Sequence, residues 1–298
     1  MKALVVRAAA KVNLALEIVR RRSDGFHEIS TVMSTVDLSD SVRISAHEGL
    51  AVHLDGAEAR GIDASDDLAG RAALAMAGEA GRKADVLIEV TKRIPVAGGL
   101  GGGSSDAGAV IRGLNEWWGL EWPAERLERV ASKIGSDVPF FVHGGSAHCG
   151  GRGDVVEPLR DMKAVRMLIL VPPVGQRPEK TARMYGALTP TDFSDGHRAK
   201  RMAQRIARGA PPPAADLRNS FEAVVERTDA ELVACFSMFR GAGAPQLHLS
   251  GAGPAVFAFI QQNVKAQALR RDLEAVGARV FEVRTLGRAD ALAMTREE

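Results

Sequence analysis

The sequence predicts an α+β protein of two lobes, and three observations support this prediction. Strand-like and helix-like segments do not alternate strictly along the chain, which disfavours a doubly wound sheet. A glycine-rich run lies between a strand-like segment and a helix-like segment near residue 100. A continuous apolar strand over 165–171 stops at Pro172 and Pro173, a natural place for a change of domain. We therefore expect an N-terminal domain over residues 1–160 and a C-terminal domain over 161–298.

The composition of the 298-residue chain is that of a globular protein. Hydrophobic residues make up 46% of it, enough for a substantial core. The 39 basic and 37 acidic side chains leave a formal charge of +2, so charge gives no indication of nucleic-acid binding. Two distant cysteines form neither a disulfide framework nor a zinc motif, and no window of about 18 apolar residues predicts a membrane span. We expect a soluble, cytoplasmic protein and make no prediction of its oligomeric state.

In the first half of the chain, short strands precede the helices. Alternating apolar residues predict strands over 4–6, 12–18, 29–36, 42–44, 51–54 and 86–90. Helical spacing of apolar residues predicts helices over 67–80, 104–117 and 124–133. Asp66 or Asp67 is expected to cap the first of these helices and Ser104 or Ser105 the second. Residues 140–156 are expected to form strands and glycine-rich turns.

The second half of the chain is expected to be richer in helices. These are predicted over 179–187, 199–207, 221–225, 230–239 and 264–276. Strands are predicted over 165–171, 246–249, 255–259 and 279–284. The proline-rich stretch 210–213 is expected to link two of the helices.

Five of the six residues over 98–103 are glycines. Each glycine costs roughly 0.5–1 kcal/mol in a helix or strand interior relative to alanine, so we expect a loop whose bare backbone approaches a ligand closely. A strand before it and a helix N-terminus after it make a site for an anion, most often a phosphate. The run fits neither the dinucleotide fingerprint nor the Walker A loop, because Ser104 stands where Walker A has lysine. The cation that neutralises phosphate must therefore come from elsewhere in the chain.

Separated segments of the sequence together resemble a known family. They are 10–14, 24–28, 99–106, 136–141 and 249–257. They resemble the small-molecule kinase superfamily of galactokinase, homoserine kinase, mevalonate kinase and phosphomevalonate kinase. Within it they are most similar to kinases that act on a cytidine diphosphate-linked methylerythritol. The resemblance implies an N-terminal domain with a left-handed βαβ feature, a ferredoxin-like C-terminal domain, and a site between the two.

The resemblance also implies a reaction: ATP- and Mg²⁺-dependent phosphorylation of the free 2-hydroxyl of the methylerythritol unit, in non-mevalonate isoprenoid biosynthesis. One alternative is a kinase of another small alcohol in the same superfamily, which residues 24–28 disfavour because such alcohols carry no nucleobase. Another is a non-catalytic relative that only binds ligand, which the presence of Lys11 and Asp137 disfavours. The expected partners are small molecules, with neither nucleic acid nor membrane among them.

Phosphoryl transfer to an alcohol needs a base near the hydroxyl and cations around the phosphate. Asp137 is the candidate base, and Pro139 biases Val138 toward an extended conformation, so we expect a turn before an apolar strand. Lys11 lies on an apolar strand segment, where a buried lysine needs a partner such as Asp137. The resemblance assigns Asp137 the role of base and Lys11 that of orienting it. The alternatives are an ordinary turn aspartate and an exposed strand lysine.

The resemblance places the acceptor beside Asn13, Phe26, His27 and Tyr185. A cytosine ring is held well by stacking together with a directional hydrogen bond. His27 is expected to contact its edge, with Phe26 and Tyr185 as the stacking faces. Without the resemblance, these side chains would be interpreted as a structural corner and as helix packing.

ATP is expected to bind at the glycine-rich run, where the loop amides hold phosphate and the following helix adds its dipole. No cluster of carboxylates or histidines predicts a metal cage, so Mg²⁺ is expected to be held mainly by phosphates and water, with its protein ligands unknown. The expected nucleotide-binding residues are Lys92, Pro95, Gly98, Gly99, Gly101, Gly102, Gly103, Ser104 and Ser105. Gly251 and Gly253 are expected to support the loop or the acceptor from the other domain.

Overall fold

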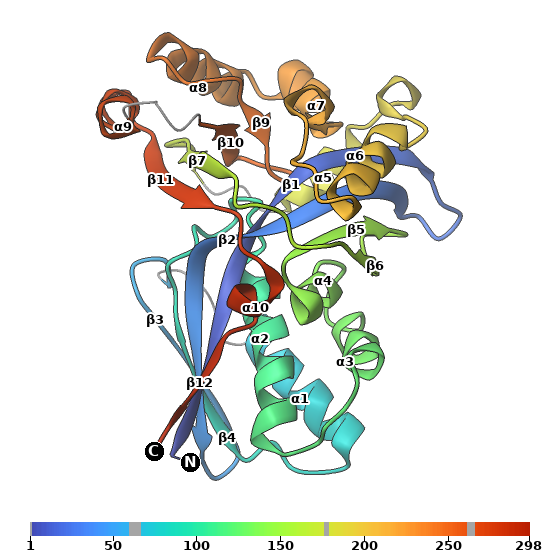
Figure 1. Cartoon of the computed structure of the whole chain (residues 1–298), viewed down its shortest axis with the longest axis vertical. Coiled ribbons are helices and arrows are strands. Elements are labelled where there is room, and N and C mark those ends of the chain that lie inside the picture. The colour runs from blue at the N-terminus through green and yellow to red at the C-terminus, as the bar shows by residue number, and fades with distance from the viewer. Residues whose placement is uncertain (1, 60–66, 176–178, 261–265) are drawn as a thin grey trace.

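The computed structural model of the chain describes residues 2–59, 67–175, 179–260 and 266–298. Within these residues the strands form two sheets, one of eight strands and one of four. Figure 1 shows the larger sheet at the end of the molecule that carries both termini, with the smaller sheet and its helices at the opposite end. None of the described helices has the length and apolar character needed to cross a membrane.

The larger sheet has the strand order β12-β1-β2-β4-β3. These strands are β1 (Ala3–Arg21), β2 (His27–Ala46), β3 (Leu50–Asp55), β4 (Val86–Thr91) and β12 (Met294–Glu297). Three shorter strands extend it: β5 (Ser146–Gly150) pairs with β2 and with β6 (Val155–Pro158), and β8 (Arg218–Asn219) pairs with β1. Strands β3 and β4 are parallel, and helix α1 (Leu68–Ala80) connects them as a βαβ unit.

Strands β1 and β2 are each longer than predicted. The segments expected over 4–6 and 12–18 are one continuous strand, as are those over 29–36 and 42–44. The β1–β2 register shifts at three places, including one between Asn13 and Ala15. Such bulges let a strand bend and re-aim a side chain without ending, so the interrupted apolar pattern was wrongly interpreted as separate strands.

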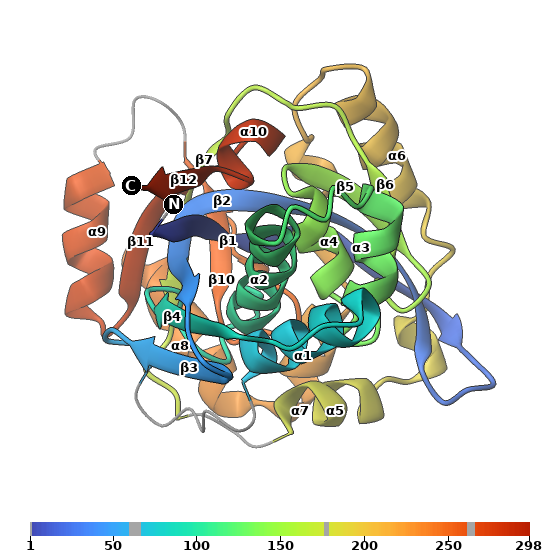
Figure 2. The same cartoon turned by 90° about the horizontal axis from the view of Figure 1, so that it is seen from below.

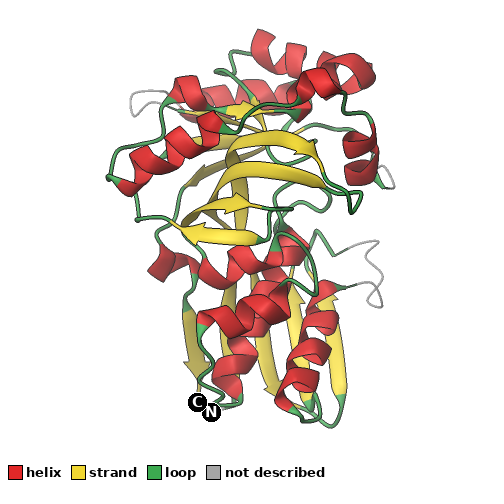
Figure 3. Cartoon of the chain, turned by 90° about the vertical axis from the view of Figure 1, so that its right-hand side faces the viewer, coloured by secondary structure: helices red, strands yellow, loops and turns green. Residues whose placement is uncertain are grey.

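Helices cover one face of the larger sheet, as the views in Figure 2 and Figure 3 show. They are α1, α2 (Gly102–Trp117), α3 (Ala124–Ala131) and α4 (Val138–His143). Fully buried side chains of α2, among them Val110 and Leu114, belong to one core cluster with Leu4 and Ile44 of the sheet. Gly113 of α2 leaves room for Ile44, because an added Cβ would lie 2.5 Å from its Cδ1. This close packing holds α2 against the larger sheet, and the glycine-rich loop leads into the start of the same helix.

The smaller sheet is antiparallel with the order β11-β7-β10-β9. Its strands are β7 (Arg166–Val171), β9 (His248–Leu249), β10 (Val256–Phe259) and β11 (Arg279–Arg284). The accompanying helices are α5 (Lys180–Gly186), α6 (His197–Ala207), α7 (Phe221–Thr228), α8 (Ala230–Gly241) and α9 (Ala266–Ala275). The beginning of the helix expected over 264–276 lies outside the described residues.

Two local predictions were wrong near the cleft. Residues 138–143 form helix α4 rather than a strand, because a proline is tolerated in the first turn of a helix and Pro139 sits there. Helix α2 begins at Gly102, two residues before the prediction, with Gly101 as its N-cap. Neither Ser104 nor Ser105 is therefore the cap. Asp67 does cap α1, with its side chain accepting from the Ala69 amide at 3.2 Å; Asp66 lies outside the described residues.

The end of the chain returns to the larger sheet. A short helix, α10 (Arg288–Ala291), leads to β12, which pairs antiparallel with residues 3–6 of β1. Strand β8 also comes from the second half of the chain and pairs parallel with β1. The two parts of the chain that were predicted as separate domains, before and after residue 160, therefore both contribute strands to one sheet.

Candidate active site

The glycine-rich loop connects β4 to α2 and exposes backbone amides at a helix N-terminus. Gly101 adopts a left-handed conformation (φ 74°), and the amide of Ser105 makes the first hydrogen bond of the helix, to Gly101. The N–H groups of residues 102–104 have no acceptor within the helix. The Ser105 hydroxyl points away from the loop and donates to the Ala9 carbonyl at 2.7 Å. Free amides and the helix dipole together favour a bound anion here.

The loop contacts the second glycine motif directly. The Ser250 hydroxyl donates to the Gly99 carbonyl at 3.0 Å, and the Ala255 amide donates to Gly98 at 3.1 Å. A Cβ added to Gly99 would lie 2.1 Å from the Ser250 carbonyl oxygen, so this approach requires glycine. Residues about 150 positions apart thus form one backbone surface.

Lys11 lies beside this backbone surface and makes several polar contacts there. Its side chain comes from β1 and only 3% of the residue is exposed. The ammonium donates to the Asn13 Oδ1 at 2.6 Å and to the Gly99 carbonyl at 3.0 Å. The Asp137 Oδ2 lies 3.6 Å from the same Nζ atom. The predicted pairing of Lys11 with Asp137 is confirmed, and the Asp137 carboxylate remains open to the cleft, with 37% of its side chain exposed.

A group of aromatic rings forms the other end of the cleft. The rings of His27 and Tyr185 stack with centroids 5.1 Å apart and planes inclined by 27°. Phe193 and Phe221 surround this pair, with ring centroids 6.1 Å from His27 and 5.0 Å from Tyr185 respectively. Phe26 is half exposed at the mouth of the cleft. Flat apolar faces of this kind suit a planar ring ligand.

Burial and the neighbouring Arg21 guanidinium lower the pKa of His27. Its imidazole is therefore neutral at pH 7, with one ring nitrogen as donor and the other as acceptor. Burial raises the pKa of the Tyr185 hydroxyl, which stays protonated. The rings of His27 and Tyr185 thus offer hydrogen-bonding groups and carry no net charge.

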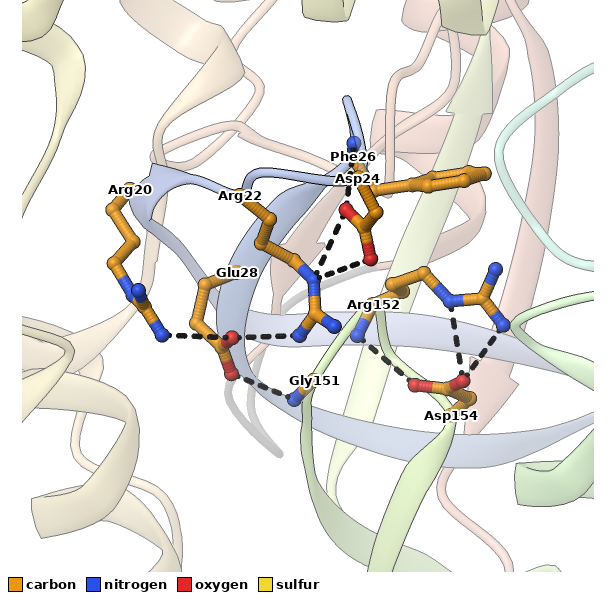
Figure 4. A network of polar contacts seen from close by, with 8 residues as sticks. All are labelled: Arg20, Arg22, Asp24, Phe26, Glu28, Gly151, Arg152 and Asp154. Atoms are coloured by element: carbon orange, nitrogen blue, oxygen red, sulfur yellow. Dashed lines mark hydrogen bonds and ion pairs between the residues drawn. The ribbon is translucent and has the colours of Figure 1, made fainter.

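Two turns meet at the rim beside these rings, and Figure 4 shows their polar contacts. Glu28, next to His27, accepts from the Gly151 amide at 3.1 Å and from the Arg22 Nη1 at 2.9 Å. Asp154 holds Arg152 through its Nη2 at 3.0 Å, and the Arg152 guanidinium carbon lies 4.8 Å from the centre of the Phe26 ring. The β1–β2 and β5–β6 turns are thereby fixed to each other.

A single pocket of about 1380 Å³ joins the loop, the Lys11–Asp137 pair and the aromatic rings. The predicted site residues that line it are Lys11, Asn13, Phe26, His27, Gly99, Gly101, Ser104, Asp137, Tyr185, Gly251 and Gly253. Pro95, Gly98, Gly102, Gly103 and Ser105 support the loop without lining the pocket. Most of the predicted residues therefore come together in one cleft.

Lys92, predicted to meet the nucleotide, does not reach the pocket. It is buried beneath the loop, where its ammonium forms ion pairs with Asp40 and Asp106. Burial alone would lower the pKa of Lys92, but the Asp106 and Asp40 carboxylates outweigh it and the pKa is raised. Lys92 is thus a buried cation that connects β2, β4 and α2.

Several pocket residues escaped prediction from the sequence, among them Arg152, Phe193 and Phe221. The two phenylalanines are more than 160 positions from His27, and nothing in their local sequence separates them from core residues. Arg152 carried a weak signal, because it stands in a Gly-Arg-Gly turn of the kind that brings a side chain to a surface.

Comparison with known proteins identifies relatives of nearly the same length. The models of the GHMP kinases N-terminal and C-terminal domains match residues 67–145 and 197–279. A protein of Dehalococcoides mccartyi named 4-diphosphocytidyl-2-C-methyl-D-erythritol kinase is 36% identical over 96% of this chain and 100% of its own. The Bacillus subtilis protein of the same name is 33% identical over 97% of this chain and 99% of its own.

Solved structures show the same similarity. A crystal structure of 4-(cytidine 5'-diphospho)-2C-methyl-D-erythritol kinase superposes with a TM-score of 0.78 at 31% identity, covering 95% of this chain and 99% of that one. Homoserine kinase from Cytophaga hutchinsonii shares the fold alone, with a TM-score of 0.76 at 15% identity over 99% of this chain and 98% of its own. The two-domain kinase fold expected from the sequence is confirmed.

Proposed function

The chain belongs to the GHMP kinase family and, within it, to the 4-diphosphocytidyl-2-C-methyl-D-erythritol kinases, and we propose how its cleft performs the phosphoryl transfer. It is an ATP-dependent kinase of isoprenoid biosynthesis with a small-molecule acceptor. One observation carries the proposal for the site: a single pocket holds the Lys11–Asp137 pair between the loop residues Gly99, Gly101 and Ser104 and a cluster of aromatic rings.

The amides at the start of α2 bind the phosphates of ATP. Gly99 and Gly101 have positive φ values and turn the backbone toward the pocket. Phosphoryl transfer demands positioning and charge stabilisation more than covalent chemistry from the protein, and oriented N–H groups supply both. Lys11 provides the cation that the loop itself lacks.

Asp137 accepts the proton of the acceptor hydroxyl. Its carboxylate is open to the pocket and adjoins the Lys11 ammonium, which is held by the Gly99 carbonyl within the phosphate loop. A hydroxyl placed beside Asp137 is therefore also beside the transferring phosphate. Proximity of the base, the nucleophile and the phosphate lowers the barrier, because the entropy of orienting them is lost on binding and not in the chemical step.

Mg²⁺ fits this site as an ion held chiefly by the nucleotide. Ser104 lines the pocket at the helix N-terminus, and among the described residues its hydroxyl has no hydrogen-bond partner, so it is a suitable oxygen ligand. Mg²⁺ prefers such oxygen donors together with phosphates and water. When bound, it neutralises charge on the phosphates.

The aromatic end of the pocket accepts the cytosine. Neutral His27 presents a donor and an acceptor to a base edge, and Phe26 and Tyr185 offer stacking faces. In this acceptor a diphosphate separates the hydroxyl from the nucleobase. Arg152 lies between the corresponding parts of the pocket, because its guanidinium contacts the Phe26 ring and the neighbouring Gly153 adjoins Asp137. A kinase for an alcohol without a nucleobase would have no use for these rings.

The test is ADP release from ATP and Mg²⁺ with 4-diphosphocytidyl-2-C-methyl-D-erythritol, compared with the same compound lacking the cytidyl group. Turnover of the cytidyl compound alone is expected. His27→Ala should raise KM for this acceptor and leave KM for ATP unchanged, whereas the matched His53→Ala, at an exposed position of β3, should change neither. Equal turnover of both compounds would refute the nucleobase site, and turnover of neither would refute the acceptor assignment.

A further inference from the structure

A buried hydroxyl lies beside Asn13 in the wall of the pocket, on a residue to which the proposed mechanism assigns no role. Thr31 belongs to β2 and is 1% exposed. It lies against the segment of β1 where the register shifts between Asn13 and Ala15. Its Oγ1 atom contacts both the Ala15 carbonyl and the Asn13 side-chain amide.

The direction of each hydrogen bond follows from the groups involved. The Ala15 carbonyl can only accept, so the single Thr31 hydroxyl proton is donated to it, at 2.7 Å. The Thr31 oxygen can then only accept, and the group it faces on Asn13 must be the Nδ2 donor, at 3.0 Å. The Asn13 Oδ1 consequently faces the opposite side, where the Lys11 ammonium donates to it at 2.6 Å.

This arrangement gives the Lys11 ammonium two hydrogen bonds and one ion pair. It donates to the Asn13 Oδ1 and to the Gly99 carbonyl, and it forms an ion pair with the Asp137 carboxylate at 3.6 Å. The contact with Asn13 is the shortest of the three and the contact with Asp137 is the longest. The position of Nζ relative to Asp137 therefore depends on where the Asn13 oxygen is held.

We propose that Thr31 is a positioning residue for phosphoryl transfer, acting through Asn13 to hold Lys11 against Asp137. The proposal rests on the proposed function of Lys11 and Asp137. Without the Thr31 hydroxyl, the Asn13 Nδ2 would be buried with one acceptor lost, and the amide would turn to satisfy it elsewhere. Lys11 would then lose the fixed partner that sets its distance from the base.

The variant Thr31→Val keeps the shape of the side chain and removes the hydroxyl. We expect kcat to fall about tenfold to 100-fold, because a displacement of about 1 Å at a reacting group has effects of this size. KM for ATP should stay within about twofold, since the loop amides are untouched, and Thr31→Ser should restore kcat. If Thr31→Val does not fold, Thr31→Ala takes its place.

The matched control is Thr285→Val. Thr285 is also buried, at 4% exposed, and its hydroxyl oxygen accepts from the Val165 amide at 3.0 Å, without contacting Asn13 or lining the pocket. It should lose stability as Thr31→Val does and keep its kcat. A second check uses Asn13→Ala, in which adding Thr31→Val should have no further effect on kcat. Wild-type kcat in Thr31→Val, or an equal loss in Thr285→Val, would overturn the proposal.

A readout independent of turnover separates this proposal from the proposed function. The side-chain amide protons of Asn13 should be protected from exchange in the NMR spectrum of the wild-type protein and lose protection in Thr31→Val alone. If the wild-type protein phosphorylates no acceptor, the proposed function fails while these protons still decide whether Thr31 holds Asn13. Unchanged protection in Thr31→Val would refute the role of Thr31.

Discussion

Lys11 is a buried ammonium, and its surroundings determine what the cleft can do. Removing such a charge from water is costly unless its protons are all used in well-formed hydrogen bonds. Two neutral oxygens, from Asn13 and Gly99, satisfy part of this need at short distance, and the charged partner Asp137 stands farther away. The carboxylate is therefore attracted to Lys11 without being sequestered by it, which leaves it free to take a proton.

Asp137→Asn tests this arrangement at a single atom pair. The amide is the same size but cannot accept a proton from the hydroxyl, so kcat should fall at least about 100-fold. The affinity for ATP should remain within about twofold, because the loop amides lie on another element. Single-turnover kinetics and calorimetric titration with ATP measure the two quantities. Turnover equal to that of the wild-type protein would remove Asp137 from the mechanism.

For single residues, the sequence predicts which side chains interact better than it predicts how far apart they lie. A lysine in an apolar strand needs a carboxylate, and the resemblance of residues 136–141 to the family motif indicated Asp137. Lys11 and Asn13 are two residues apart on β1, so their side chains lie on one face of the strand, whereas the role of Lys92 depends on Asp40 and Asp106 closing around it. This closure is not encoded in a local pattern, so Lys92 was assigned to the nucleotide.

Gly99 allows the phosphate loop and the 250–253 motif to approach each other. It has a φ of 81° and its added Cβ would lie 2.1 Å from the Ser250 oxygen, a backbone atom that cannot move aside alone. Gly99→Ala should therefore destabilise the protein by about 1–3 kcal/mol from the backbone strain alone, and weaken ATP binding. Urea denaturation and ATP titration are the measurements.

The control for Gly99→Ala is Gly78→Ala, at an exposed position of helix α1, where an added Cβ meets no atom within 4 Å. There alanine should stabilise the protein by about 0.5–1 kcal/mol, because it restricts the unfolded chain and favours the helix. Similar shifts of the urea midpoint in the two variants would show that the contact between Gly99 and Ser250 is dispensable.

Elements whose pattern is local were predicted well, and elements that depend on context were not. Helix α1 with its Asp67 cap and strand β7 with its proline stop both lie where expected. Helix α4 is only six residues long and its first five residues are apolar, so periodicity could not separate it from a strand. Strand β12 is exposed at every residue and has no apolar alternation to reveal it.

Over the whole molecule, the two halves of the chain complete each other. The second half supplies β8 and β12 to the first sheet and the 250–253 motif to the phosphate loop. The cleft accordingly takes its loop and base from one half and Tyr185, Phe193 and Phe221 from the other. Such pairing over long separations has no signature in the sequence, whereas motifs within 99–106 or 136–141 could be recognised locally.

Removal of residues 294–298 tests what the returning strand contributes. It would break the β12 ladder, including the bond from the Lys2 amide to the Glu297 carbonyl at 2.8 Å, and bare the edge of β1 where Leu4 is buried. Thermal unfolding should shift down by several degrees, since about 1 kcal/mol corresponds to about 2–4 °C in a chain of this size class. The kinetic constants should hold, because β12 pairs with residues 3–6 and the cleft begins at Lys11.

The variant Glu297→Gln keeps the ladder and removes only the ion pair with Arg43, whose Nε lies 2.9 Å from the Glu297 carboxylate. This pair is exposed, so its loss should lower stability by no more than about 1 kcal/mol. A truncated protein with the unfolding temperature of Glu297→Gln would show that the charge, not the ladder, accounts for the effect. Loss of turnover at an unchanged unfolding temperature would instead show that the end of the chain acts on the cleft. That result would contradict the expectation that β12 and the cleft, which lie at different parts of β1, are independent.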